Sequence, residues 1–135
     1  MNKYVALLLL SLAQVTMADI YIIVNPANHN TLTIDDVRNI FLGKVRSFPD
    51  GSTAIAVELA ESSPLRKEFN KKVLNKDDSQ VRAYWAQMVF TGRATPPKTV
   101  DSEDELSKLV AKNPNIIGYV GTETTGSDVH VALKK

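Results

Sequence analysis

Apolar residues recur along the chain with two different spacings, and together they predict an alternation of strands and helices. Short continuous runs rich in β-branched residues occur at residues 20–24 and 116–120, and such runs are typical of strands buried on both faces. Residues 53–57 predict a shorter strand, and residues 129–133 alternate like an edge strand. The pattern therefore predicts four strands.

Four segments between these strands carry apolar residues at helical spacing. The first begins after Thr33, with Asp36 three residues later in the arrangement of a capping box. The second begins at Ser62-Ser63-Pro64, where a hydroxyl cap precedes a proline in the first turn. The third opens at Asp77, and the fourth opens at Ser102.

The third helix carries the only tryptophan of the chain. Trp85, Met88 and Val89 fall on one helical face, which favours a place in the core. A ligand-stacking platform of Trp85 with Tyr84 and Phe90 is the alternative. We therefore expect Trp85 to be mostly buried.

The elements follow one another as β-α-β-α-α-α-β-β, with Thr95-Pro96-Pro97 as an extended connector after the third helix. No repeat and no low-complexity tract interrupts this order. Mixed strand and helix order of this kind predicts an α/β domain with one mixed sheet covered by helices.

Residues 1–18 have the order of parts found in a secretory signal peptide. Lys3 supplies the positive start, residues 5–12 are apolar apart from one serine, and Ala18 is a small residue at the cleavage position. The apolar run is shorter than the roughly 20 residues that span a bilayer. Cleavage leaves 135 − 18 = 117 residues, so we expect one exported domain at residues 19–135.

Composition narrows the function classes. The chain has 16 Lys and Arg against 15 Asp and Glu, and its basic residues are scattered, so we expect no nucleic-acid partner. It has no cysteine, so its core alone must stabilise it. An exported domain without disulfides suits a bacterial periplasm.

The residues that enzymes use are nearly missing. There is no cysteine nucleophile and no Gly-x-Ser-x-Gly motif, and neither His29 nor His130 lies in a metal-ligand pattern. Asp35-Asp36 and Asp77-Asp78 fall in first helical turns, where the helix dipole favours negative charge. We therefore expect a protein that is not an enzyme and has neither metal nor cofactor.

Ser62, Ser63 and Arg66 form a candidate anion site at the start of the second helix. A helix N-terminus presents unpaired N–H groups, and two hydroxyls with an arginine one turn later would complete the site. The alternative is that a serine caps the helix while Arg66 pairs with Glu61 or with another carboxylate, and the local sequence favours that alternative. Thr122 lies in a polar loop after a buried strand, where α/β sheets often bind ligands.

Several stretches, taken in order, resemble the phosphate ABC transporter periplasmic substrate-binding proteins, a type 2 periplasmic-binding-protein-like family. They span most of residues 20–120, and the chain is most similar to the short stand-alone members of this family. The matching stretches are Asn25-Pro26, Ile40-Phe41-Leu42-Gly43-Lys44, Ser63 with Phe69, Tyr84-Trp85 with Phe90-Thr91-Gly92-Arg93, and Asn113-Pro114 with Ile117-Gly118-Tyr119-Val120.

The resemblance implies a fold of two lobes that hold phosphate between them, of which this chain has residues for one lobe. Ser63 matches the serine of the family's Ser-Gly-Thr phosphate loop, whereas Pro64 and Leu65 replace its glycine and threonine and Leu59 stands at its arginine position. The family's Thr-Gly-Ala-Gly loop has no counterpart. The likeness thus implies the fold and the compartment more strongly than it implies phosphate binding.

Two functional hypotheses remain. In the first, the chain is a periplasmic binding module for phosphate or a similar small oxyanion, which binds through Ser62, Ser63, Arg66, Asn25 and Thr122. A membrane permease, or a second copy of the chain that closes over the same site, would be its partner. In the second, the lobe binds no ligand and serves as a protein-interaction domain for an envelope sensor, a porin or another partner.

Overall fold

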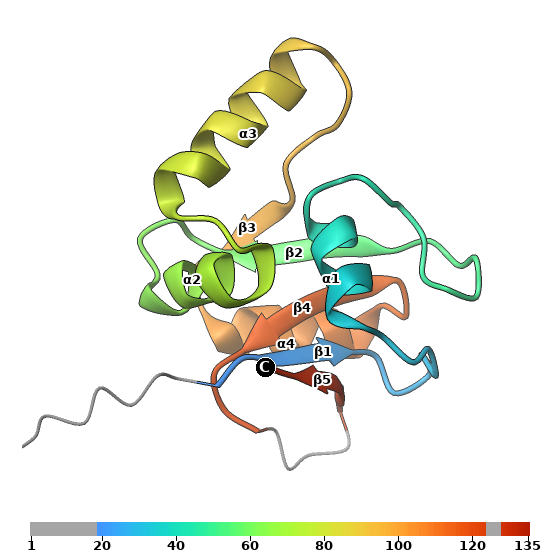
Figure 1. The fold of residues 1–135 in the computed structure, drawn as a ribbon. Coiled ribbons are helices and arrows are strands. Elements are labelled where there is room, and N and C mark those ends of the chain that lie inside the picture. Colours follow the sequence, from blue (N-terminus) through green and yellow to red (C-terminus); the bar gives the residue numbers. More distant parts are fainter. Residues whose placement is uncertain (1–18, 124–127) are drawn as a thin grey trace, which may run out of the picture.

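The computed structural model describes residues 19–123 and 128–135, and the elements in it follow the predicted order with two additions (Figure 1). The additions are a π-helical turn, η1, that prolongs α2, and a short strand, β3, after the proline connector. The signal-peptide prediction for residues 1–18 lies outside the described residues. The elements are β1 (Tyr21–Val24), α1 (Ile34–Phe41), β2 (Ile55–Leu59), α2 (Pro64–Phe69), η1 (Asn70–Leu74), α3 (Asp78–Phe90), β3 (Lys98–Val100), α4 (Glu103–Lys112), β4 (Ile116–Val120) and β5 (His130–Lys134).

The five strands form one mixed sheet in the order β3-β2-β4-β1-β5, which confirms the predicted architecture. β1 pairs antiparallel with both β4 and β5, whereas β2 pairs parallel with both β3 and β4. β2 extends two residues beyond the predicted strand, because Glu58 and Leu59 continue the ladder opposite Thr99 and Val100.

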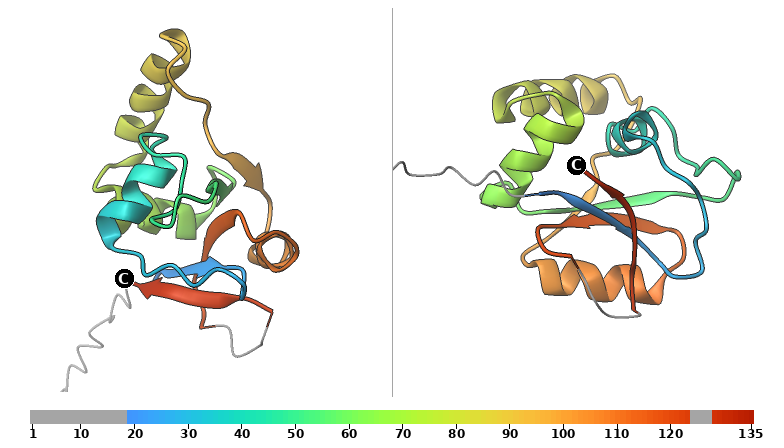
Figure 2. Two further views of the ribbon diagram at one scale, coloured as in Figure 1. Left: turned by 90° about the vertical axis from the view of Figure 1, so that its right-hand side faces the viewer. Right: turned by 60° about the horizontal axis from the view of Figure 1, so that its bottom comes forward.

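Helices cover both faces of this sheet. Figures 1 and 2 show α4 against one face and α1 with α2 against the other. The third helix, α3, stands away from the sheet beyond α2 and returns through the extended connector to β3. The side chains that fill the space between the sheet and α1 and α2 therefore form the main core.

The predicted helix starts are confirmed at their caps. Thr33 Oγ1 accepts a hydrogen bond from Asp36 N while the Asp36 carboxylate accepts one from Thr33 N, which completes the capping box of α1. Asp77 and Gln80 form the same reciprocal pair at α3. Ser102 caps α4 by accepting from the backbone N–H three residues later. Caps of this kind stabilise a helix by about 1 kcal/mol each.

Three aromatic rings lie at the centre of the core. Tyr119 of β4 stacks on Phe69 of α2, with ring centroids 4.0 Å apart and planes 8° apart. Phe41 of α1 meets Phe69 edge-on at 4.7 Å. All three side chains are fully buried. Each ring comes from a different element, so the cluster fixes α1 and α2 on the same face of the sheet.

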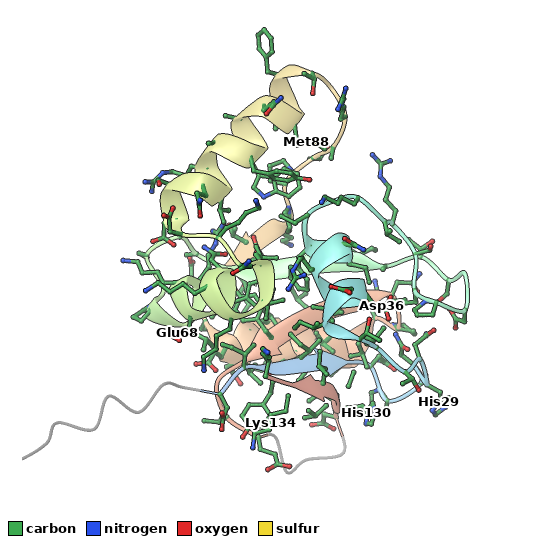
Figure 3. The ribbon with its side chains drawn as sticks, viewed as in Figure 1. His29, Asp36, Glu68, Met88, His130 and Lys134 are labelled. Atoms are coloured by element: carbon green, nitrogen blue, oxygen red, sulfur yellow. The ribbon has the colours of Figure 1, made fainter. Side chains whose placement is uncertain are left out.

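Helix α3 is only partly a core element. Trp85 is buried, as predicted, together with Val81. Val89 is 55% exposed and Phe90 is 91% exposed, so the expectation that Val89 shares the core with Trp85 is wrong. The reason is geometric, because the far end of α3, where Figure 3 labels Met88, extends past the sheet and the helices below it.

None of the helices in the described part of the chain is long and apolar enough to cross a membrane. The longest of them, α3, has 13 residues, whereas a spanning helix needs about 20.

Candidate functional site

The parallel strands bring two predicted site segments to one edge of the sheet. β2 and β4 run in the same direction, so the loops after Leu59 and after Val120 leave the sheet at the same edge. Leu65 of α2 touches this second loop, since a Cβ placed on Gly121 would lie 3.3 Å from Leu65 Cδ1. We call Ser62, Ser63, Gly121 and Thr122 the carboxyl-edge cluster.

Ser63 is the N-cap of α2, and Pro64 occupies the first helical position. Its Oγ accepts a hydrogen bond of 3.3 Å from Arg66 N, which leaves the hydroxyl proton available to donate. Ser62 and Thr122 are exposed loop residues. The capping interpretation and a binding role for Ser63 are thus compatible, because they use different parts of the same hydroxyl.

The guanidinium of Arg66 is engaged by the end of β2. Its Nη2 lies 3.3 Å from Glu58 Oε2, and its Nη1 donates to the Leu59 carbonyl at 3.2 Å. Glu58 is buried, with 3% of its side chain exposed, and Arg66 is partly buried, with 13% exposed. The sequence suggested Glu61 or another carboxylate as the partner, and the structure identifies Glu58. Glu61 instead pairs with Arg82.

The Glu58 carboxyl is electrostatically unusual. Burial raises its pKa to about 7, and the positive charge of Arg66 opposes only part of that rise. Tyr119 lies close by, and burial together with the Glu58 charge raises the pKa of its phenol far above the ordinary value. Glu58 was not among the predicted site residues, because the predicted strand ended one residue before it. The alternation of residues 55–59 was the available signal, since Glu58 shares a face with Ala56.

Asn25 lies at the other end of the sheet. β1 is antiparallel to β4, so Val24 pairs with Ile117 and the loop after β1 is far from Thr122. The Asn25 amide donates to the carbonyls of Val110 and Ala111 at 3.0 Å each, and its oxygen accepts from Ala27 N at 2.9 Å. The side chain therefore ties the end of α4 to β1, and the structure does not bring it to the cluster.

One hydrogen-bond donor of the cluster, the backbone N–H of Gly121, is already bonded to a carboxylate of the chain. Gly121 N donates to Glu103 Oε1 at 2.6 Å, a short bond to a charged acceptor. Glu103 opens α4 and is followed by Asp104 and Glu105 in the same turn. This negative charge on the β4 side leaves Ser62 and Ser63 as the more favourable side for an anion.

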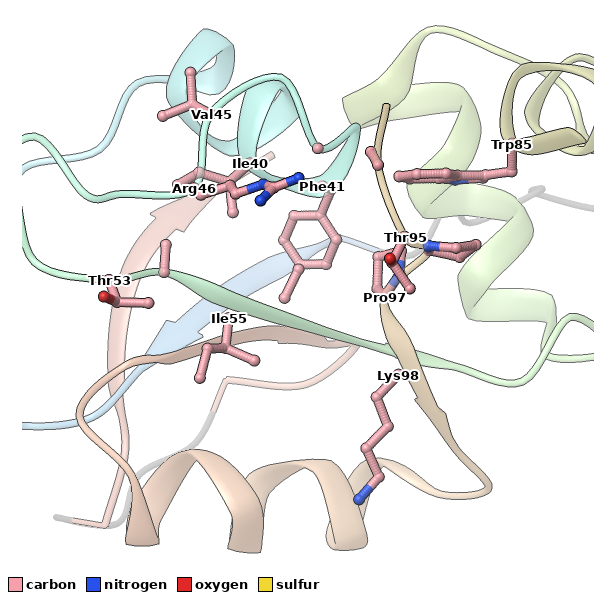
Figure 4. A pocket seen from close by; sticks show the side chains of 15 residues that line it. Ile40, Phe41, Val45, Arg46, Thr53, Ile55, Trp85, Thr95, Pro97 and Lys98 are labelled. Atoms are coloured by element: carbon pink, nitrogen blue, oxygen red, sulfur yellow. The ribbon is translucent and has the colours of Figure 1, made fainter. Parts of the chain in front are cut away.

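Two hollows lie near Trp85. A groove of about 370 Å³ runs between the end of α1, the start of β2 and the proline connector (Figure 4), with mostly apolar walls and the cations Arg46 and Lys98. A pocket of about 380 Å³, which we call the α2–α3 pocket, lies on the other side of Pro96 between α2 and α3. Arg66 lines this second pocket.

Comparison with solved structures identifies the fold. A phosphate ABC transporter substrate-binding protein from Clostridium perfringens, solved with bound phosphate, superimposes with a TM-score of 0.63 at 17% identity over 85% of this chain. An ABC-type phosphate transport receptor from Vibrio cholerae gives 0.63 at 21% identity over 85%. PstS from Borrelia burgdorferi gives 0.56 at 17% identity over 77%. The chain has the fold of one lobe of a substrate-binding protein.

The lobe accounts for less than half of each of these proteins, since the superposition covers 45%, 46% and 41% of their chains. No protein-family model and no curated protein matches the sequence. The structural likeness therefore confirms the fold that the sequence resemblance implied, and phosphate binding enters below as a proposal.

By their names, these neighbours are a substrate-binding protein and a receptor of phosphate transport systems. Within residues 19–123 and 128–135, no group of three or more His, Asp or Glu side chains is arranged to hold a metal ion. Figure 3 shows His29 and His130 at the lower right, far from α2 and α3.

Proposed function

We propose that the chain is a periplasmic binding module for phosphate or a similar small oxyanion. The observation that carries this proposal is the fold, which it shares with phosphate-binding and phosphate-transport proteins over 85% of its length. A membrane permease of an ABC transporter is the partner that this type of module would serve.

The oxyanion is proposed to bind at the carboxyl-edge cluster. Ser63 places a hydroxyl donor at the start of α2, and Ser62 and Thr122 add hydroxyls from the adjoining loops. Arg66 is not counted as a direct contact, because Glu58 and the Leu59 carbonyl engage its guanidinium. Ligands of open α/β sheets commonly bind outside the carboxyl ends of parallel strands.

Binding to a single lobe should be weak. Hydrogen bonds to a charged oxyanion contribute about 1.5–3 kcal/mol each when they are shielded from water. One lobe leaves half of the ligand in solvent, and Glu103 adds negative charge beside Gly121. We therefore expect millimolar affinity for a monomer, and tighter binding only where a second copy closes over the same site.

Isothermal titration with phosphate and with sulfate tests this proposal. The parent chain should bind at millimolar ligand, and Ser63→Ala should weaken binding about tenfold or more by removing one charge-assisted bond. Thr33→Ala is the matched control, because it removes the cap of α1, which follows β1 at the other end of the sheet. The absence of binding in the parent would reject the proposal, and equal binding in parent and Ser63→Ala would move the site elsewhere.

A protein-interaction domain is the second candidate, and one observation favours it. Phe90 and Val89 present an exposed apolar tip on α3, and such tips are common in contact surfaces. A photoreactive residue introduced at position 90 should then crosslink a specific envelope protein in the native host. The same residue at the exposed Lys71 would report background contacts. Equal crosslinking at both positions would reject this candidate.

A further inference from the structure

The α2–α3 pocket is separate from the carboxyl-edge cluster and has its own chemistry. It lies between α2, η1 and α3 and has a volume of about 380 Å³. Among its polar residues, Asn70 is buried and 13% of the Arg66 side chain is exposed, whereas Glu61 and Arg82 form an exposed ion pair. The pocket lining therefore combines largely buried polar side chains with an exposed charged pair.

Two buried polar atoms on residues that line the pocket have no hydrogen-bond partner among the described residues. Asn70 is 3% exposed, and its amide nitrogen donates to Asp78 Oδ1 at 3.1 Å. Because a carboxylate only accepts, that bond fixes the amide orientation and leaves Asn70 Oδ1 as a buried acceptor without a donor. Arg66 Nε is a buried donor without an acceptor. The missing hydrogen bonds of these two atoms cost stability. A ligand with one donor and one acceptor would restore it.

The charges around the pocket are balanced. Arg66 and Arg82 are matched by Asp78 and Glu61, and Glu58 lies behind Arg66. A dianion such as phosphate would meet the two carboxylates at close range, and a dication would meet the two arginines. A ligand with one positive and one negative group and no net charge complements this lining best.

The remaining wall is apolar. Val81, Trp85 and Pro96 face the pocket, and Val81 and Trp85 are 3% and 8% exposed. An aliphatic side chain would bury its surface there.

We propose that the α2–α3 pocket binds a small free α-amino acid with an aliphatic side chain. The carboxylate of the ligand accepts from Arg66 Nε with Arg82 nearby. Its ammonium group donates to Asn70 Oδ1 and to the Asp78 carboxylate, and its side chain packs on Trp85. This site does not depend on the oxyanion proposal, since neither Ser62 nor Ser63 lines the pocket.

Intrinsic fluorescence gives a direct test, because Trp85 is the only tryptophan of the chain and lines the pocket. Titration with L-valine should change the Trp85 emission with saturation. Isobutylamine and isovalerate, which each keep one of the two charged groups, should bind at least about tenfold more weakly. Phosphate should not compete with valine. The absence of a saturable change at tens of millimolar valine, or equal binding of isobutylamine, would overturn the proposal.

Variants locate the site. Asn70→Leu removes the unpaired acceptor at similar volume and should weaken valine binding about tenfold or more. Arg82→Gln, an exposed position, should weaken valine and isovalerate together without unfolding the chain. Ser102→Ala should leave valine binding unchanged. If Asn70→Leu and Arg82→Gln both bind valine like the parent, the pocket is not the site.

Discussion

Glu58 and Arg66 bring opposite charges into the interior beneath α2. Transfer of both charges from water is costly, and their mutual attraction offsets this cost only when the remaining polar atoms are also paired. Here one Arg66 nitrogen has no partner and the two charged groups meet at 3.3 Å. The pair therefore lowers the stability of the fold. The titration of Glu58 should be measurable as a change in the free energy of unfolding with pH.

The raised pKa of Glu58 predicts how stability depends on pH. The folded chain holds the Glu58 proton up to about pH 7, whereas the unfolded chain releases it near the ordinary value of 4.5. Between these values the folded state binds more protons, so the free energy of unfolding falls as pH rises from 4.5 to 7 and levels off above that range. A shift of this size corresponds to about 3 kcal/mol at most.

Urea unfolding at pH 5 and pH 8 checks this prediction. Glu58→Gln should lose most of the decrease that the parent shows between the two pH values. Glu61→Gln is the control, because its carboxylate belongs to the exposed pair with Arg82. A parent-like decrease in Glu58→Gln would show that other groups cause it.

Single residues were predictable from the sequence where their partners are local. Ser63, Thr33 and Asp77 cap helices through atoms three residues away, so the sequence alone contains both partners. Arg66 and Asn25 bond to atoms that only the tertiary fold brings near. Their positions were therefore identified, but their roles depended on the order of strands in the sheet.

At the scale of elements, α3 joins the rest of the protein mainly through Val81 and Trp85, its two buried residues. Trp85 is 8% exposed and its indole lies beside Gly43. Tyr84 anchors the same turn by donating from its hydroxyl to the Leu42 carbonyl. The last turn of α3, with Phe90, has no comparable support. The same helix thus serves as core at one end and as free surface at the other.

This division predicts very different effects on stability for two aromatic substitutions in α3. Trp85→Ala should lower the free energy of unfolding by about 3–5 kcal/mol, because it leaves a large cavity. Phe90→Ser should change it by less than about 0.5 kcal/mol, because that ring is in solvent. Urea denaturation of both variants provides the measurement. If Trp85→Ala unfolds like the parent, Trp85 is a contact residue and its packing role is rejected.

Gly118 predicts a second element-scale effect, where β4 meets α4. A Cβ at this position would lie 2.2 Å from Leu106 Cδ2, so the Leu106 side chain occupies the space that an added methyl group would need. Gly118→Ala should destabilise the chain by about 1–3 kcal/mol. Leu106→Ala, which creates space there, should cost about 2–5 kcal/mol alone.

The double variant tests the contact itself. Because the shortened side chain at position 106 makes room for the added methyl group, the two effects should not add, and the shortfall should be about 1 kcal/mol or more. Additive effects would indicate that Gly118→Ala acts through the strand backbone instead.

Element positions were less predictable where pairing partners are distant. Strand β3 has only three residues, two of them exposed, so no periodicity marks it. It forms because β2 offers an unpaired edge beside Val57, Glu58 and Leu59. The last residues of β2 and the whole of β3 are thus strands only because they pair with each other. This pairing depends on the assembled sheet and not on the local sequence.

At the scale of the whole molecule, the superposed part of the chain corresponds to 45% and 46% of two of the proteins that share its fold. The antiparallel pairing of β1 with β5 continues to the last residue of the chain. Ile20 N donates to the Lys135 carbonyl at 3.0 Å, and Lys135 N donates back to Ile20 at 2.8 Å. Asp19 adds an ion pair with Lys134 at 3.7 Å. The pairing of β1 with β5 therefore begins directly after the proposed cleavage point.

This pairing of Ile20 with Lys135 predicts how the removal of residues 1–18 affects stability. A chain that starts at Asp19 keeps every bond just described, so its urea midpoint should equal that of the full-length chain. Deletion of Lys134 and Lys135 should lower stability by about 1–3 kcal/mol, because it leaves the backbone of Ile20 without a partner. Intact mass of the protein from periplasmic extracts of its native host should correspond to residues 19–135. A periplasmic species that retains Met1 to Ala18, or a loss of stability on their removal, would contradict the proposed signal peptide.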